Sequence, residues 1–492
     1  FALGFGFEKF APHVGHASGQ LDGVSGSATP EAFQSMEFWF LAREAVPSRN
    51  AREMVPALDT RAGRIRMPRM KFTLLLMSAM LLTGSAMAAP ADWPINQDEA
   101  KVPVYVLPEL MKAADGTLVK TADDWRWERR PELLKIFEEG MYGKAPARPA
   151  LVYEVLEDSV PALDGKARRK QVRVYFGGKK EGPAMDVLIY VPAGTSGPVP
   201  FFWGLNFQGN HTVSADPGIL LPRPPVESAD MPRPKPLKAF ARGDQGDRWQ
   251  IEWVLSQGYG TATAWYEDID PDFDDGFKNG VHGLFPGVEA KRDGTTWGSL
   301  AAWAWGLRVG MDYLAMEPWC DARQVALHGH SRLGKATLWA GAQDERFDVV
   351  ISNNSGCGGA ALNKRWFGET VGRINTSFPH WFAGNFKQWN GREAEMPYDQ
   401  HGLLALVAPR GLLVCSAEED QWADPEGELQ ATKQASPAFV LLGQTGLEAG
   451  FKRENLAVSP GNPGYWQRPG KHDVTADDWK RWTGFVKARW GK

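Results

Sequence analysis

The sequence predicts an α/β fold, a three-layer αβα sandwich around a mostly parallel central sheet with surface insertions. Two observations support this prediction. From residue 247 onward, short apolar runs alternate with helical runs, which is the pattern of a parallel sheet covered on both faces. Upstream, residues 171–177 and 185–192 alternate apolar and polar side chains, as antiparallel strands do. Because these elements are contiguous, we expect residues 89–492 to form one catalytic domain.

The first half of this domain is expected to be mainly β-structure. A helix ended by glycine and proline is predicted over 131–146, and a further strand, 199–207, follows the antiparallel pair. Residues 212–246 are rich in proline and charge, which indicates a long surface insertion. A helix over 247–258 and a strand over 259–266 then begin the regular alternation.

The second half repeats helix and strand in turn. The predicted helices are 295–316, 334–345, a helical insertion within 363–405, one helix between the last two strands, and 475–490. The predicted strands are 324–328, 347–354, 411–417 and 438–442.

Residues 67–88 have the features of a secretory signal peptide. A basic start and an apolar run over 72–82 precede small residues that end at Ala88. The run is shorter than the roughly 20 residues that span a bilayer, so we expect no membrane anchor. Residues 1–66 show no sustained period and are expected to be a disordered or wrongly assigned extension. The mature protein is therefore expected to begin near Ala89 and to be secreted or periplasmic.

The composition argues against several functional classes. A formal net charge of −4 gives no reason to expect nucleic acid as a partner. Most of the 21 tryptophans are expected to pack in the interior, and the rest suit a groove that stacks sugar rings or aromatic ligands. Cys320, Cys357 and Cys415 lie in or beside apolar runs, which favours buried small side chains over a disulfide framework or a zinc site. We expect a monomer without metal or cofactor.

A candidate nucleophile stands between a predicted strand and a predicted helix. Residues 325–335 read VALHGHSRLGK, so Ser331 occupies a strand–turn–helix elbow. This elbow, with antiparallel strands ahead of the parallel ones, indicates an α/β-hydrolase fold, whose catalytic residues follow the order Ser, acid, His. Gly329 and Gly334 allow close passage of backbones, although the pattern is G-x-S-x-x-G rather than G-x-S-x-G. The alternative is an ordinary helix N-cap serine.

The base and the acid are sought downstream of the serine. His472 lies after the last predicted strand and before the last helix, where an α/β-hydrolase carries its base. The acid should follow a strand between Ser331 and His472, and Asp420 is the first position able to turn back towards the histidine. Glu419 and Asp424 are the next candidates, and a solvated acidic loop is the alternative.

A second acidic run, EDIDPDFDD over 267–275, does not fit a calcium-binding loop. A loop of the EF-hand type that starts at Asp268 would place Phe273 where glycine is needed and Asn279 where glutamate is needed. The run is therefore expected to be a polar loop at the carboxyl end of a strand, and no metal is expected there.

At these residues the chain resembles the glucuronoyl esterases, family fifteen of the carbohydrate esterases, in their bacterial form. The resemblance extends over essentially all of the mature chain. Its motifs are LNFQGNH (205–211), GHSRLGK (329–335), NNSGCGGAAL (353–362), TSFPHWFAGNF (376–386), SAEEDQWADPEGE (416–428) and the loop that carries His472.

The resemblance implies hydrolysis of the esters that join (4-O-methyl-)glucuronic acid side chains of xylan to lignin alcohols. It implies Ser331 as nucleophile and His472 as base. It also assigns Arg332 to the oxyanion hole, where an always charged guanidinium adds a donor to the backbone N–H groups. The residues implied to contact the glucuronate are Lys335, Glu369 and Trp422.

One motif departs from the fungal members, which carry the acid in a QESGSGG-like run after the strand that follows the serine. Here the run reads NNSGCGG, and Asn354 occupies the position of the glutamate. Many bacterial members resemble this chain in having an acid after the later strand, which corresponds to Asp420. His330 replaces the fungal cysteine before the serine, so the fungal disulfides are not expected.

Two other functions stay open at this point. One is an acetyl xylan or feruloyl-type esterase, against which Lys335, Glu369 and Trp422 favour a uronate substrate. The other is a non-catalytic carbohydrate-binding protein that kept the α/β-hydrolase fold and lost the acid.

Overall fold

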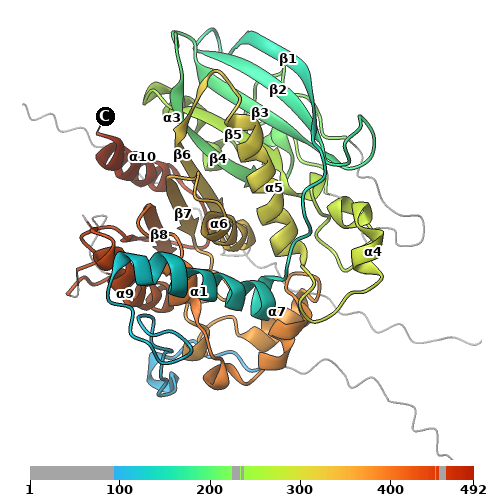
Figure 1. Ribbon diagram of the computed structural model, residues 1–492. Helices are drawn as coiled ribbons and strands as arrows, with labels where there is room; N and C mark the ends of the chain where they lie inside the picture. Colours follow the sequence, from blue (N-terminus) through green and yellow to red (C-terminus); the bar gives the residue numbers. More distant parts are fainter. Residues whose placement is uncertain (1–92, 224–232, 234–237, 449, 454–460, 492) are drawn as a thin grey trace, which may run out of the picture. The chain divides into compact units, whose positions relative to one another are not determined.

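A nine-stranded sheet forms the centre of the described part of the chain (Figure 1). The computed structural model describes residues 93–223, 233, 238–448, 450–453 and 461–491, so the expectations for residues 1–66 and 67–88 lie outside the described residues. The strands are β1 Val152–Ala162, β2 Ala167–Tyr175, β3 Ala184–Pro192, β4 Val199–Asn206, β5 Gly260–Trp265, β6 Cys320–His330, β7 Val349–Asn353, β8 Gly411–Ala417 and β9 Gly464–Arg468.

The strand order is β1-β2-β3-β5-β4-β6-β7-β8-β9. The pairings from β1 to β3 and between β3 and β5 are antiparallel. All pairings from β5 through β4 to β9 are parallel. This mostly parallel sheet with an antiparallel edge confirms the predicted α/β-hydrolase fold.

Helices cover both faces of the sheet. The α-helices of the described residues are α1 Arg130–Phe137, α2 Gly246–Trp249, α3 Ile251–Ser256, α4 Pro286–Glu289, α5 Ser299–Leu314, α6 Arg332–Gln343, α7 Val371–Ser377, α8 Gln400–Ala405, α9 Pro425–Leu441 and α10 Ala476–Trp490. Figure 1 shows α5 beside α6, and these two helices contribute to the larger apolar core. Helices α3 and α10 contribute to a second core, in which Ile251 and Val254 are buried with Trp479 and Trp482.

Successive residues of one strand serve these two cores. In β6, Val325 and Leu327 belong to the core of α5 and α6, whereas Ala326 belongs to the core of α3 and α10. This two-residue period is that of a strand buried on both faces. Of the tryptophans, Trp303 and Trp339 are among the largest fully buried side chains, as expected for packing residues.

The prediction of a strand over residues 438–442 is wrong. The chain up to Leu441 belongs to the helix α9, which continues through Pro437 although proline lacks the N–H that an interior helical position donates. The last strand is instead β9, a five-residue segment flanked by Pro463 and Gly470. His472 still follows the last strand and precedes the last helix, α10.

The loops of interest all leave the same edge of the sheet. Strands β4 to β9 are parallel, so their carboxyl ends meet at one edge. Ser331 follows β6, Asn354 follows β7, Asp420 follows β8 and His472 follows β9. Ligand sites of open α/β sheets form at this edge.

Candidate active site

Ser331 occupies the strained turn that joins β6 to α6. Its backbone has φ 57° and ψ −129°, a region that non-glycine residues rarely adopt. The turn requires Gly329, because a Cβ there would lie 2.3 Å from the carbonyl oxygen of Leu333 and 2.4 Å from Thr337 Oγ1. The geometry is that of a nucleophile elbow, which exposes a serine at the edge of the sheet.

The structure brings His472 and Asp420 into direct contact. His472 Nδ1 donates to Asp420 Oδ2 over 2.6 Å, and Asn354 Nδ2 donates to the same oxygen over 2.8 Å. The side chain of Asp420 is 4% exposed and that of His472 is 40% exposed. A buried carboxylate that binds Nδ1 orients an imidazole with its Nε2 towards the open side, as a general base requires.

The two neighbouring acids do not have this geometry. Glu419 is exposed. Asp424 Oδ2 accepts from Arg365 Nε over 2.9 Å, and Asp424 Oδ1 accepts the Gly427 N–H at the start of α9. Burial raises the pKa of Asp424 to about 6. Asp420 is therefore the carboxylate, among these three, that orients His472.

His330 packs against the candidate base. Its ring centroid lies 4.4 Å from that of His472, and its Nδ1 lies 2.7 Å from Asn353 Oδ1. Burial, followed by the nearby charges of His472 and Arg248, lowers the pKa of His330 well below its ordinary value. A neutral His330 places no like charge beside the imidazolium that His472 would form.

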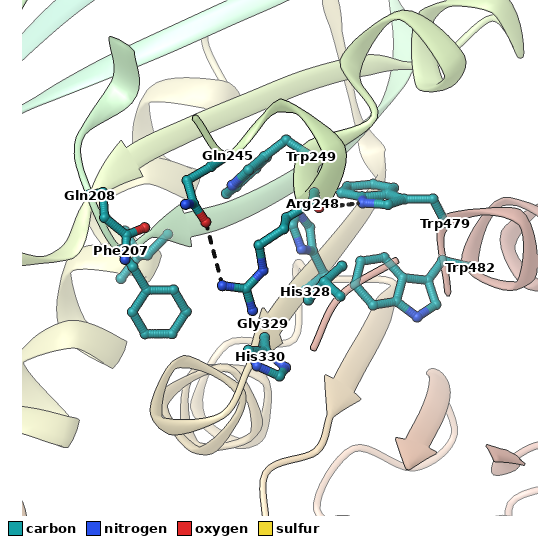
Figure 2. Close-up of a pocket in the computed structure, with 12 residues that line it drawn as sticks. Phe207, Gln208, Gln245, Arg248, Trp249, His328, Gly329, His330, Trp479 and Trp482 are labelled. Carbon is teal, nitrogen blue, oxygen red and sulfur yellow. Dashed lines mark hydrogen bonds between the residues drawn. The ribbon is translucent and has the colours of Figure 1, made fainter. Parts of the chain in front are cut away.

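A pocket lies beside His330, on the side lined by α2 and α10 (Figure 2). His330 lines it from the end of β6, Phe207 from the loop after β4, and Arg248 from α2. Arg248 Nε lies 2.8 Å from Asp473 Oδ1, so α2 is tied to the residue that follows His472. The ion pair is partly exposed and links α2 to the loop that carries His472.

The guanidinium of Arg332 is held beside the elbow. Its Nη1 donates to Asp272, and its carbon lies 4.8 Å from the ring centroid of Trp381 and 5.4 Å from that of Phe378. Burial opposes the charge, but the Asp272 carboxylate outweighs it and raises the pKa of Arg332 above its ordinary value. The sequence had given no role to Asp272.

Lys335, Glu369 and Trp422 come together one helical turn from Ser331. Lys335 Nζ donates to the carbonyl oxygens of Ser355 and Cys357, both over 2.6 Å, and lies 3.6 Å from Glu369 Oε2. The Glu369 N–H donates to the carbonyl oxygen of Trp422 over 3.0 Å. Burial raises the pKa of Glu369. These three residues form a charged and aromatic corner beside the elbow.

A buried glutamate supports the loop after β7. Glu428 Oε1 accepts the N–H groups of Ser355 and Gly356 over 2.8 and 3.0 Å, while its Oε2 lies 2.5 Å from Ser416 Oγ. Burial raises the pKa of Glu428 to about 8. The loop that Glu428 holds carries Asn354 and the carbonyl groups that bind Lys335.

Three further findings concern only the residues that the structure describes. They contain no group of three or more His, Cys, Asp and Glu side chains able to hold a metal ion. No helix among them is long and apolar enough to span a bilayer. Cys320, Cys357 and Cys415 are buried and unpaired.

The fold, the strained serine and the buried His–Asp pair define the class of the α/β-hydrolases. The family model "Glucuronyl esterase, fungi" matches residues 290–443. A carbohydrate esterase from an unknown prokaryotic organism, MZ0003, is 48% identical over 391 residues, which cover 78% of this chain and 89% of the relative.

Two solved structures are similar as well. A glucuronoyl esterase from Solibacter usitatus is 48% identical, with a TM-score of 0.74, over 80% of this chain and 100% of its own. A promiscuous CE15 esterase from a marine bacterial metagenome is 47% identical, with the same TM-score of 0.74 and the same coverage, 80% and 100%. The chain belongs to this family, the glucuronoyl esterases of carbohydrate esterase family fifteen, and is therefore a carboxylic ester hydrolase.

Proposed function

We propose that the protein hydrolyses the esters that join (4-O-methyl-)glucuronic acid side chains of xylan to lignin alcohols, with Ser331 as nucleophile, His472 as base and Asp420 as acid. The observation that carries this proposal is the 2.6 Å contact between His472 Nδ1 and the buried Asp420 at the same sheet edge as the Ser331 elbow. The name of the Solibacter usitatus relative supports the glucuronoyl ester as substrate.

The reaction follows from these positions. Ser331 Oγ attacks the ester carbonyl of the uronate while His472 Nε2 takes the hydroxyl proton, and the Asp420 carboxylate stabilises the imidazolium. His472 then returns the proton to the departing alcohol as the carbon–oxygen bond breaks, which leaves the glucuronoyl group on Ser331. Water, deprotonated by His472, attacks the carbonyl carbon of this acyl-enzyme; as the bond to Ser331 Oγ breaks, His472 returns the proton to Oγ and glucuronate is released.

Arg332 is proposed to stabilise the negative charge that develops on the carbonyl oxygen. A charged, fixed donor aimed at that oxygen in a partly dry site gives one of the largest contributions to catalysis. The corner formed by Lys335, Glu369 and Trp422 is proposed to bind the sugar, because its charged groups can exchange hydrogen bonds with hydroxyls and its indole can pack on the ring.

Rates on two substrates test this proposal. The purified enzyme is expected to release alcohol from a benzyl ester of glucuronic acid faster than acetate from acetylated xylan. Because the marine relative is described as promiscuous, measurable acetate release is compatible with the proposal. Faster turnover of the acetate would contradict the uronate preference, and a wild-type enzyme that binds xylan but hydrolyses neither ester would favour the non-catalytic alternative.

We also propose that the enzyme is exported and acts as a monomer without a membrane anchor. The signal-peptide pattern of residues 67–88 supports export, with cleavage after Ala88. N-terminal sequencing of protein recovered from a periplasmic or culture fraction is expected to begin at Ala89, and light scattering to give the mass of a single chain. A retained 67–88 segment or a dimeric mass would contradict these expectations.

A further inference from the structure

The acidic run over 267–275 follows β5 at the catalytic edge of the sheet, and its carboxylates have different partners. Glu267 pairs with Arg233, and Asp270 Oδ2 lies 3.6 Å from His282 Nε2. Asp274 is exposed. Asp272 instead points at the elbow, where its side chain is 5% exposed.

Asp272 accepts four hydrogen bonds with its two oxygens. His380 Nε2 lies 2.9 Å from Oδ1, and Trp381 Nε1 donates to the same oxygen over 2.8 Å. Tyr266 donates to Oδ2 over 3.0 Å, and Arg332 Nη1 donates to that oxygen as well. A carboxylate that has two hydrogen-bond donors on each oxygen is fixed in place and has little capacity left for a ligand.

The contact with Asp272 fixes Arg332 and uses only part of the N–H groups of its guanidinium. One Nη1–H is committed to Asp272, while the Arg332 Nε–H is buried without a hydrogen-bond partner among the described groups. The planar guanidinium also lies over the Trp381 ring, so its orientation is restricted from a second side. A guanidinium restricted on two sides, whose side chain is still 29% exposed, is a fixed positive charge that a developing oxyanion can approach.

We propose that Asp272 is a positioning residue for the ester hydrolysis, which holds Arg332 in the orientation that serves the oxyanion. This inference rests on the proposed oxyanion role of Arg332. Asp272 reaches the substrate only through Arg332, so its loss lowers the rate of the chemical step and leaves sugar binding by the Lys335 corner largely intact. The acidic run thus contributes one residue to catalysis without touching the reacting atoms.

A double-mutant cycle on benzyl glucuronate hydrolysis tests the proposal. Asp272→Asn is expected to lower kcat by about 100-fold, near the lower limit for removal of one oxyanion donor, with KM within about threefold of the wild-type value. Asp272→Asn combined with Arg332→Ala is expected to be no slower than Arg332→Ala alone, because both changes remove the same contribution, that of the oriented Arg332 guanidinium. Asp274→Asn removes the same charge from an exposed position of the same run and is expected to keep the wild-type kcat.

A second variant guards against a folding defect in Asp272→Asn. Trp381→Phe removes one donor to Asp272 Oδ1 but keeps an aromatic ring under Arg332, and we expect it to lower kcat about tenfold with an unchanged circular dichroism spectrum. Wild-type kcat in Asp272→Asn beside a reduced kcat in Arg332→Ala would overturn the role of Asp272 alone. Multiplicative losses in the double variant would overturn it too. Wild-type kcat in Arg332→Ala would overturn both this inference and the oxyanion role.

Discussion

Replacing Asp420 by asparagine tests whether the negative charge of this carboxylate is needed for catalysis. Asp420 Oδ2 accepts from both His472 Nδ1 and Asn354 Nδ2, over 2.6 and 2.8 Å. An asparagine at position 420 can present its carbonyl oxygen to both donors, and the fixed Asn354 amide favours that orientation. The histidine then keeps its tautomer, and the variant loses the negative charge alone.

The size of the loss follows from that charge. The hydrogen-bond geometry puts the centres of the carboxylate and imidazolium charges about 4 Å apart, where their attraction is about 4 kcal/mol at an effective dielectric constant of 20. Since about 1.4 kcal/mol corresponds to a factor of ten in rate, kcat should fall about 1,000-fold. Adding Asn354→Ala frees the asparagine amide to turn its NH₂ towards His472, which imposes the wrong tautomer, and a further loss of about tenfold is expected.

The assay is the initial rate of benzyl alcohol release from benzyl glucuronate, with the fold checked by circular dichroism. Glu419→Gln is the matched control, because Glu419 is the adjacent acid and is exposed. Its kcat is expected to equal that of the wild type. Full activity in Asp420→Asn, or an equal loss in Glu419→Gln, would refute the assignment of the acid.

Three further predictions concern the support of the site. Asn354→Ala alone removes one donor from Asp420 and is expected to lower kcat about fivefold, the equivalent of about 1 kcal/mol, in the same ester assay; an unchanged kcat would contradict this. Gly329→Ala is expected to destabilise the fold by more than about 2 kcal/mol in denaturant titrations, because the added Cβ meets backbone at 2.3 Å; wild-type stability would contradict the tightness of the elbow. Glu428 has its pKa raised to about 8 in the folded protein, so wild-type stability falls as pH rises from about 4.5, where the unfolded carboxyl ionises, to about 8. Glu428→Gln mimics the protonated carboxyl and is expected to reduce that fall in unfolding free energy by on the order of 1 kcal/mol per pH unit. Unfolding free energies that change with pH in the same way in the variant and the wild type would contradict this prediction.

The fold was predictable because its elements carry strong local patterns. The central strands are apolar on both faces, and the helices around them have clear periodicity, so the parallel sheet and its antiparallel edge emerge from the sequence alone. The error at residues 438–442 has a physical origin. Pro437 suggests that a helix ends before it, and the β-favouring side chains that follow resemble a strand, yet tertiary packing continues α9 to Leu441. The true strand β9 is too short and too closely flanked by proline and glycine to stand out.

Sequence reasoning could place members of the candidate site only where a residue has a characteristic position relative to an element. Ser331, Asp420 and His472 lie in the loops after β6, β8 and β9. The partners of these residues depend on side-chain directions across loops that are distant in the sequence. Asn354 meets Asp420 across 66 positions and Asp272 meets Arg332 across 60, and neither pair carries a local signal. The unexplained acidic run and the asparagine in NNSGCGG were the hints that the sequence offered.

The central claim is that Ser331 attacks a glucuronate ester at this elbow. The most direct test compares the rate of benzyl alcohol release from benzyl glucuronate by the wild type and by Ser331→Ala at equal concentration. The wild type is expected to turn the ester over, and the folded variant to lose at least about a thousandfold in kcat, since only oxyanion stabilisation and binding remain. Equal rates in the two proteins, or no release by the wild type, would contradict the claim.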